Sequence, residues 1–490
     1  MSEKIHHHVI IIGTGFAGLG MAIRLNQHGM TDFVVLERAA EVGGTWRDNR
    51  YPGCACDVPS QLYSFSFALN PSWTRSFSSQ PEIWDYLRHC TDRYGIRPHI
   101  RFHHDVLEAR WDHPERRWRV RANCGELTCD VLITGTGALS EPNIPDIPGL
   151  NTFRGAVFHS ARWALDYDLR GRQVAVVGTG ASAIQFVPRI QPEVAALTLF
   201  QRTPAWIMPR SERGIGGAEQ RLYRAVPALQ RLVRAGIYCG RESLVPGFAV
   251  NPRLLTVAEV IARAHLRHQV ADPVLRAKLT PDYAIGCKRI LISNDYLPAL
   301  TRPNVRLVTS AIARIGADWA QARDGTRSDV DTIIFGTGFH VTDMPMATRL
   351  RGRDGRTLAE VWSGGAQAHR GTTIAGFPNL FMLVGPNTGL GHTSLIYMIE
   401  SQVAYTLDAL RYLKHSGAAA VEVSPEAQLA YNRVIQRRMQ GTVWTSGGCA
   451  SWYLDAHGRN TTLWPTFTWR FRRATRKFDP ANYYTHHPVS

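Results

Sequence analysis

Two glycine-rich turns, each between an apolar strand and a helix, constrain the fold of this chain most strongly. The first turn spans 13–18, after a strand expected over 8–12 and before a helix expected over 19–28. The second spans 178–183 and follows a strand expected over 173–177. In this setting the free N–H groups of the helix N-terminus bind the pyrophosphate of a dinucleotide. The sequence therefore predicts two dinucleotide sites in one α/β protein.

The residues of the first turn and of the strand after it indicate which nucleotide binds there. Gly13 permits the tight turn, Gly15 lets the backbone approach the pyrophosphate, and Gly18 lets the helix pack closely on the strand. The next strand, expected over 33–36, ends at Glu37, whose carboxylate can accept hydrogen bonds from ribose hydroxyls. We assign this site to FAD. The alternative is a glycine turn that holds no ligand.

The second turn differs in the residue at the end of its following strand. The turn residues that we expect to contact a cofactor are Gly178, Thr179, Gly180, Ser182 and Ala183. The strand expected over 197–200 continues into Gln201, Arg202 and Thr203. An acidic residue there would repel a 2′-phosphate, whereas arginine binds it with charge-assisted hydrogen bonds. The sequence thus predicts NADPH in the second site, in a fold of two Rossmann-like domains. The alternative for Arg202 is a solvated surface arginine.

Two further motifs carry a resemblance to a known family. Between the nucleotide turns stands Phe-x-Gly, three residues, His159, three residues, Trp163. Near the first turn stands Gly43-Gly44-Thr45-Trp46, then Tyr51-Pro52-Gly53 and Asp57. Together these motifs resemble the type I Baeyer–Villiger monooxygenases, a branch of the flavin-containing monooxygenases. In that family Pro or Asp usually follows the tryptophan, and here Ala164 follows it. The resemblance covers nearly the whole chain.

The resemblance implies a discontinuous arrangement of domains. It places an FAD-binding domain at 1–150 and 381–490, an NADPH-binding domain at 151–212 and 287–380, and a helical insertion at 213–286. In the insertion, apolar residues recur at helical spacing from 222 to 237, with arginines between them, and Pro227 interrupts or kinks the helix. We expect the insertion to cover the active site. A basic amphipathic helix on a membrane surface is the alternative.

The chemistry implied by the resemblance uses both cofactors. NADPH reduces FAD, and the reduced flavin adds O₂ to form a C4a-peroxyflavin that inserts one oxygen beside the carbonyl of a small-molecule ketone, giving an ester or lactone. The family's catalytic residues correspond to Arg289, which would hold the peroxide anion, and Asp57, which would orient it. His159 and Trp163 would couple the linker to NADP binding. The alternative for Asp57 is a turn aspartate, and for His159 a buried, hydrogen-bonded histidine.

Other segments are expected to complete the cofactor sites. A strand and glycine turn at 332–338 would close the second domain. The resemblance further implies that the helix expected over 395–413 points its N-terminus at the flavin ring, where it stabilises negative charge, and the alternative is an ordinary loop-to-helix start. The further residues expected to contact cofactors are Phe16, Gly44, Thr45, Trp46, Tyr63, Gly338, Phe339, Asn387 and Leu390.

Composition limits the partners that we expect. The net charge is +16, with five lysines against 51 arginines, yet no recognised nucleic-acid motif is present, and we expect no nucleic-acid partner. No run of about 18 apolar residues indicates an integral membrane segment, and the N-terminus lacks the apolar core of a signal peptide. The eight cysteines lack metal-site spacing, so we expect reduced thiols, no metal and a cytoplasmic location.

Two other functions stay open at this point. One is an N- or S-oxygenating flavin-containing monooxygenase, against which Trp163 and Arg289 argue. The other is a non-catalytic flavin- and NADPH-binding redox sensor, which would reduce flavin without oxygen transfer. The sequence leaves open which ketone is oxidised, the regio- and enantioselectivity, the extent of heteroatom oxidation and the oligomeric state.

Overall fold

The computed structural model describes residues 5–487. The molecule has two halves, and the one that contains the N-terminal strand, the first half, is built around an eight-stranded sheet. The strands of this sheet are β1 His6–Ile12, β2 Phe33–Leu36, β3 Ile100–Arg101, β4 Val106–Asp112, β5 Arg117–Ala122, β6 Gly125–Thr134, β17 Leu350–Arg351 and β18 Leu380–Met382. Their order is β17-β4-β5-β6-β1-β2-β3, and β18 also pairs with β6. The central strand β1 is parallel to both β2 and β6. Its run of Val9 to Ile12 is almost fully buried, as expected for a parallel strand covered on both faces.

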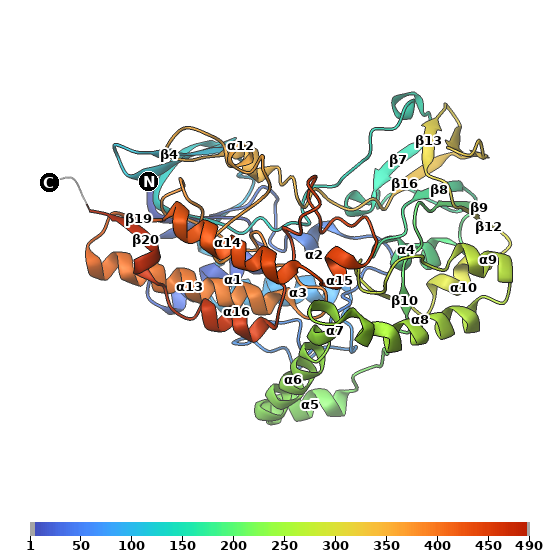
Figure 1. Cartoon of the computed structure of the whole chain (residues 1–490), viewed down its shortest axis with the longest axis horizontal. Coiled ribbons are helices and arrows are strands. Elements are labelled where there is room, and N and C mark those ends of the chain that lie inside the picture. Colours follow the sequence, from blue (N-terminus) through green and yellow to red (C-terminus); the bar gives the residue numbers. More distant parts are fainter. Residues whose placement is uncertain (1–4, 488–490) are drawn as a thin grey trace.

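A second, fully parallel sheet forms the core of the other half, on the right in Figure 1. Its strands are β7 Ala156–His159, β8 Gln173–Val177, β9 Ala196–Phe200, β12 Val305–Val308 and β16 Thr332–Phe335, in the order β12-β9-β8-β16-β7. The antiparallel strands β13 Ile312–Ile315, β14 Trp319–Ala322 and β15 Arg327–Asp329 pack against it through a shared apolar cluster. The α/β fold with two Rossmann-like units is therefore confirmed.

One helix follows each glycine turn, as expected. Helix α1 (Phe16–Gln27) begins three residues earlier than its apolar pattern indicated, directly after Gly15. Helix α4 (Ala183–Ile190) follows the second turn. The other helices outside the insertion are α2 Thr45–Asp48, α3 Gln80–Arg93, α10 Tyr296–Leu300, α11 Met346–Arg349, α12 Leu358–Val361, α13 Leu395–Ser416, α14 Pro425–Met439, α15 Val443–Ser446 and α16 Thr468–Ala474.

The C-terminal part of the chain returns to the first sheet. Strand β18 pairs with β6 in parallel, and α13 packs along α1 on the left of Figure 1. The antiparallel pair of β19 (Ala420–Val423) and β20 (Tyr483–His486) lies at the same side. Strand β17 already pairs with β4, before the expected boundary at 381. The division into two domains stays a prediction, and this pairing favours placing 346–380 with the first sheet.

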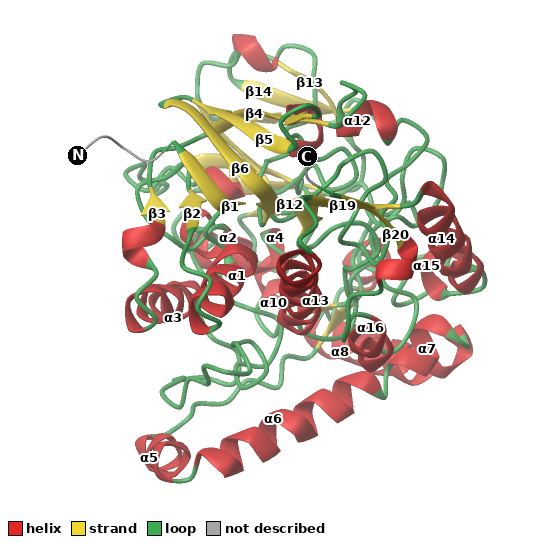
Figure 2. Cartoon of the chain, turned by 90° about the vertical axis from the view of Figure 1, so that its left-hand side faces the viewer, coloured by secondary structure: helices red, strands yellow, loops and turns green. Residues whose placement is uncertain are grey.

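The helical insertion projects from the lower edge of the molecule. Its helices are α5 Gly217–Ala225, α6 Pro227–Glu242, α7 Val245–Ala249, α8 Thr256–Gln269 and α9 Pro273–Lys278. Figure 2 shows α6 along the lower edge with α5 at its end. Pro227 interrupts the helical pattern as predicted, because it is the first residue of α6, where its missing N–H needs no partner. None of the helices within 5–487 has the length and apolarity needed to cross a membrane.

One pair of cysteines contradicts the expectation that all thiols are reduced. Cys287 and Cys449 form a disulfide with their Cα atoms 6.2 Å apart. Spacing along the sequence could not reveal the pair because 162 residues separate its members. The free cysteines are Cys54, Cys56, Cys90, Cys124, Cys129 and Cys239.

Candidate active site

The first glycine turn is too crowded for a side chain at Gly13 or Gly18. Gly13 has φ +97°, and a Cβ there would lie 3.0 Å from the carbonyl oxygen of Gly135 at the end of β6. A Cβ on Gly18 would lie 1.9 Å from the Gly13 oxygen, so α1 can pack on β1 only with glycine at this position. The loop before α2 also touches the turn, because a Cβ on Gly44 would lie 3.0 Å from the Cα of Gly15. This bare backbone cradle fits the pyrophosphate of a dinucleotide.

Glu37 lies beside this cradle as predicted. Its side chain is buried at the end of β2 and accepts hydrogen bonds from the backbone N–H groups of Thr14 at 3.0 Å and Ala39 at 2.9 Å. A guanidinium nitrogen of Arg47 lies 2.9 Å from the same carboxylate. The Thr14 hydroxyl also donates to Glu37, so protein donors already occupy the roughly four lone-pair sites of this carboxylate, and a ribose hydroxyl would bind by replacing one of them.

Aromatic residues predicted for the flavin side gather next to the same turn. Trp46, in α2, donates its indole N–H to the Tyr63 hydroxyl at 3.0 Å. The Phe16 ring meets the Tyr63 ring edge-on at 5.3 Å between centroids. Thr45 begins α2 directly after Gly44. The structure thus brings together two sequence motifs and Tyr63, which lies in neither of them.

The second turn has the same backbone geometry, but it leaves room for the Cβ atom of Ala183 at the position where the first turn has Gly18. Gly178 has φ +108°, and a Cβ there would lie 2.5 Å from the carbonyl oxygen of Gly336 at the end of β16. Ala183, in the place of the third glycine, is fully buried at the start of α4. Thr179 donates its hydroxyl to the Thr203 carbonyl at 3.1 Å and so joins the turn to the end of β9.

A pair of cations lies at the end of β9. The exposed Arg202 follows this strand, and burial together with the charge of Arg202 lowers the pKa of Lys288. The Lys288 ammonium lies 4.9 Å over the ring of Tyr283, which donates its hydroxyl to the Pro204 carbonyl. Lys288 was missed by the sequence analysis, because only the fold brings it to Arg202. Two adjacent cations suit a phosphate group.

Asp57 and Arg289 form a two-pronged ion pair. The Arg289 Nε and Nη2 atoms donate to the two Asp57 oxygens at 2.6 and 2.7 Å, and Nη1 donates to the Leu390 carbonyl at 3.3 Å. Burial alone would raise the pKa of Asp57, but the Arg289 guanidinium outweighs it and lowers this pKa. Asp57 in turn raises the pKa of Arg289. Both groups are therefore ionised at neutral pH.

The loop that carries Asp57 is fixed to the other half of the molecule. Gln185 of α4 donates to the Ala55 carbonyl at 3.0 Å and accepts from the Tyr51 hydroxyl at 3.0 Å. A Cβ on Gly53 would lie 2.8 Å from the Gln185 backbone oxygen. The ion pair therefore lies at the junction of the two halves. The alternative of an ordinary turn aspartate does not account for this arrangement.

Two more residues at the pair were not predicted. Arg241, near the end of α6, interacts electrostatically with both Asp57 and Arg289, and its burial lowers its pKa. This interaction brings α6 of the insertion within electrostatic range of the ion pair, and the expectation that the insertion covers the active site stays a prediction. Tyr453 is buried beside Arg289, and burial raises its pKa to about 12 while the guanidinium opposes the rise. No motif marks either residue, because they come from the insertion and the C-terminal tail.

The segment before α13 also reaches this site. The Asn387 side chain donates to the carbonyls of Asn460 at 2.9 Å and Leu463 at 3.0 Å, and its φ is +57°. Leu390 supplies the carbonyl that contacts Arg289. The hydroxyl of Ser394 caps the start of α13 at 3.3 Å from the Ile396 nitrogen. The segment that leads into this long helix thus reaches the ion pair through the Leu390 carbonyl.

The predicted linker residues lie against Phe339 and against α4. His159 ends β7, is buried, and accepts the Ala161 N–H at 3.1 Å, and burial lowers its pKa to about 4. Its ring meets Phe339, which follows Gly338, at 5.8 Å. Trp163 packs on Phe186 of α4 at 5.3 Å. The linker therefore contacts the helix that holds the Asp57 loop. Within 5–487 no group of three His, Cys, Asp or Glu side chains is placed to bind a metal.

Comparisons with known proteins agree with this geometry. A family model described as pyridine nucleotide-disulphide oxidoreductase matches residues 10–213. A Baeyer–Villiger monooxygenase of Streptomyces coelicolor is 56% identical over 490 residues, covering 99% of this chain and 94% of the relative. One of Pseudomonas aeruginosa is 50% identical, covering 98% of this chain and 91% of the relative.

Solved structures extend the similarity to three dimensions. Cyclohexanone monooxygenase from Rhodococcus sp. Phi1, bound to NADP⁺, has a TM-score of 0.88 and 26% identity, covering 99% of this chain and all of that chain (100%). A complex of OTEMO with FAD and NADP has a TM-score of 0.89 and 27% identity, with coverage of 99% and 100%. Fold and site thus define a flavoprotein oxidoreductase with two dinucleotide sites. The chain belongs to the Baeyer–Villiger monooxygenases and is an FAD- and NADPH-dependent enzyme of that family.

Proposed function

We propose that the Asp57–Arg289 pair carries the oxygen-transfer half of a Baeyer–Villiger oxidation of a small-molecule ketone by O₂. The observation that supports this most is the two-pronged ion pair at the junction of the two halves. Its two hydrogen bonds have nitrogen-to-oxygen distances of 2.6 and 2.7 Å. An arginine held in this way is a permanent, oriented cation. Such a group stabilises negative charge that develops during a reaction, because it needs no reorganisation when the charge appears.

Each residue has a separate part in this proposal. FAD, when bound, accepts hydride from NADPH and activates O₂ for insertion of one oxygen atom beside the carbonyl. Arg289 then stabilises the negative charge of the oxygen donor and the charge that grows on the ketone oxygen. Asp57 fixes the plane of the guanidinium by binding two of its three nitrogens. Arg241 adds positive charge at the same place.

The cofactor contacts are proposals of the same kind. We assign the FAD pyrophosphate to the Gly13 cradle, the ribose to Glu37 and the flavin side to the aromatic residues around Trp46. We assign the 2′-phosphate of NADPH to Arg202, Thr203 and Lys288. Their support is the crowded backbone at the cradle, which a side chain would fill, and the adjacent cations at the end of β9. The cytoplasmic location expected from the sequence stays a prediction.

Isotope labelling tests the proposed reaction. The FAD-loaded protein is incubated with NADPH, ¹⁸O₂ and a panel of linear, cyclic, aryl and steroid ketones, and products are identified by mass. We expect at least one ester or lactone that carries a single ¹⁸O atom. The matched control uses ¹⁶O₂ and gives the unlabelled ester. Oxidation of NADPH with peroxide release but no ester from any ketone class would contradict the proposal.

A further inference from the structure

We propose that the Cys287–Cys449 disulfide positions Arg289 for oxygen transfer and so keeps NADPH oxidation coupled to ester formation. The cysteines act through Arg289 and are positioning residues. The inference therefore rests on the role proposed for Arg289 above. It goes beyond that role because it assigns a function to a covalent link between two segments that lie far apart in the sequence.

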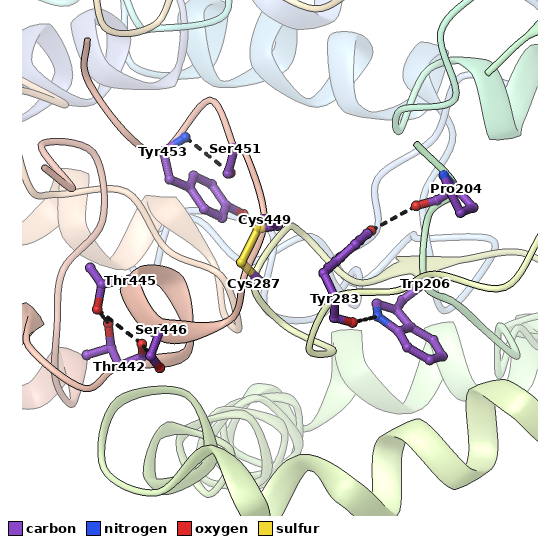
Figure 3. The surroundings of a disulfide bond; sticks show 10 residues. All are labelled: Pro204, Trp206, Tyr283, Cys287, Thr442, Thr445, Ser446, Cys449, Ser451 and Tyr453. Atoms are coloured by element: carbon purple, nitrogen blue, oxygen red, sulfur yellow. Dashed lines mark hydrogen bonds between the residues drawn. A yellow bond between two sulfur atoms is a disulfide. The ribbon is translucent and has the colours of Figure 1, made fainter. Parts of the chain in front are cut away.

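The two linked segments, 284–289 and 447–453, lie directly against each other (Figure 3). Besides the disulfide, the Ala284 N–H donates to the Gly447 carbonyl at 3.0 Å. A Cβ on Gly447 would lie 2.7 Å from the Cys287 Cβ, so the backbone after α15 is in close contact with Cys287. The disulfide thus closes an interface that is already tightly packed.

Both segments carry residues of the active site. Cys287 is followed at once by Lys288 and Arg289. Four residues after Cys449 comes Tyr453, which is buried and interacts with the Arg289 guanidinium. The covalent bond and this contact therefore join the same two segments at two neighbouring points. Opening the disulfide would leave the Tyr453 side of Arg289 without its covalent support.

Within the described residues, the hydrogen bonds of Arg289 itself are made by the end of its side chain. The guanidinium binds Asp57 and the Leu390 carbonyl, whereas the backbone of 284–290 belongs to no helix or strand. The strand that follows, β11 (Leu291–Ile292), has only two residues and pairs with β10 (Ile207–Met208). The disulfide is thus the covalent restraint nearest to the base of this side chain. A displacement of about 1 Å in a reactive group can cost on the order of a hundredfold in rate.

The chemistry of the link is a reversible exchange between thiols and disulfides. Two thiols and one molecule of oxidised glutathione, a low-molecular-weight disulfide, give the protein disulfide and two molecules of reduced glutathione. Two electrons and two protons move from the cysteines to glutathione. A dithiol such as dithiothreitol reverses the reaction and is itself oxidised to a cyclic disulfide. The protein can therefore be studied with the bond open or closed without mutation.

The first measurement asks whether the bond is present in the purified holoenzyme. Thiols are counted after denaturation without reductant and again after full reduction. The chain has eight cysteines, of which six are free, so we expect six thiols before reduction and eight after. Eight thiols in the unreduced protein would overturn the proposal.

The second measurement separates a positioning role from mere stabilisation. Cys287→Ser, Cys449→Ser and the double variant are compared with Cys124→Ser, which removes an exposed free thiol elsewhere. Per bound flavin and at saturating NADPH, where a shift of Lys288 does not limit binding, we expect the rate of flavin reduction to stay within about twofold, because Arg289 serves the later step. The ester formed per NADPH should fall on the order of tenfold, with peroxide released instead. The control should match the wild type.

Several outcomes decide the matter even if a variant folds poorly. Wild-type enzyme opened with dithiothreitol should lose coupling and regain it after oxidised glutathione. Variants that melt earlier but keep the wild-type ester yield per NADPH would show a purely stabilising bond and overturn the inference. If Arg289→Ala itself retains full ester yield, the role of Arg289 fails. If that variant loses ester while the cysteine variants keep it, only the present inference fails.

Discussion

In both halves of the molecule, a glycine with positive φ follows the central strand and lies against a glycine that ends the neighbouring strand. Gly13 has φ +97° and its Cβ position is 3.0 Å from the Gly135 oxygen. Gly178 has φ +108° and its Cβ position is 2.5 Å from the Gly336 oxygen. The closing strands β6 and β16 thus support the turns in the same way. The two motifs therefore share glycine where the backbone has positive φ and a Cβ atom would meet the neighbouring strand.

The two turns differ in the residues that select the ligand. In the first half Gly18 lets α1 touch the turn, whereas the second half has Ala183 at the same place. The first half ends its second strand with the buried Glu37, and the second half ends it with the exposed Arg202 near Lys288. On the cofactor assignments proposed above, the comparison teaches that a common backbone would hold pyrophosphate, while the strand end would distinguish a ribose hydroxyl from a phosphate.

Among the variants that test the difference between the two turns, Gly18→Ala should have the largest effect on flavin content and stability. The new Cβ would lie 1.9 Å from the Gly13 oxygen, so α1 must move away from β1. Overpacking of this kind costs about 1–3 kcal/mol. We expect the purified variant to lack FAD and to melt at a lower temperature. The reverse exchange, Ala183→Gly, is the control and should retain its flavin. A flavin-to-protein absorbance ratio equal to wild type in Gly18→Ala would contradict the account.

A smaller effect, on the KM for NADPH, is expected from variants at the end of β9 in the second half. Arg202→Ala should raise the KM for NADPH by about tenfold to a hundredfold, because a charge-assisted hydrogen bond contributes about 1.5–3 kcal/mol. The KM for NADH should change little. Lys288→Ala should act in the same direction, and Arg221→Ala, an exposed arginine of α5, is the control. Steady-state kinetics with both cofactors measures the effect. Unchanged discrimination in Arg202→Ala would show that another residue binds the 2′-phosphate.

The smallest expected effect concerns pH, and it is shared by the two halves. Burial lowers the pKa of His159, in the second half, and of His369, in the first half, to about 4 each. In the unfolded chain histidine has a pKa of about 6.5, so between these values the unfolded state binds more protons. The stability that these neutral histidines contribute is present above pH about 6.5 and is lost as the pH falls toward 4.

His159→Gln and His369→Gln should therefore each reduce the fall in melting temperature between neutral and acid pH. The exposed His457→Gln serves as the control. Thermal melts across this range measure the slope. If both variants and the control keep the wild-type slope, buried histidines do not account for the acid sensitivity of either half.

The elements around the turns could be predicted from the sequence because their signals are local. The strands at 33–36 and 173–177 have the predicted bounds, and α1 begins only three residues earlier than its apolar pattern indicated. Buried parallel strands are short apolar runs, and a residue of another kind marks the end of each of these two, Glu37 after the first and Gly178 after the second. The start of α6 at Pro227 is local in the same sense.

The active site depends on contacts that sequence spacing does not encode. Asp57 and Arg289 lie 232 residues apart, and only the family resemblance linked them before the structure did. Arg241 and Tyr453 come from segments without a motif, and they reach the pair only through the packing of the insertion and the tail. The disulfide was missed because scattered cysteines in a long chain indicate no pairing.

The most direct test of the central claim, that Arg289 serves oxygen transfer and not hydride transfer, is a paired measurement on Arg289→Ala. Stopped-flow absorbance gives the rate of flavin reduction by NADPH, and product analysis of the same sample gives the ester yield. The account predicts nearly normal reduction with ester formation lowered by about 10²–10³. Lysine at this position should rescue poorly, because it lacks the planar fork that binds Asp57. A normal ester yield would contradict the account, and lost reduction at full FAD content would assign Arg289 to NADPH binding instead.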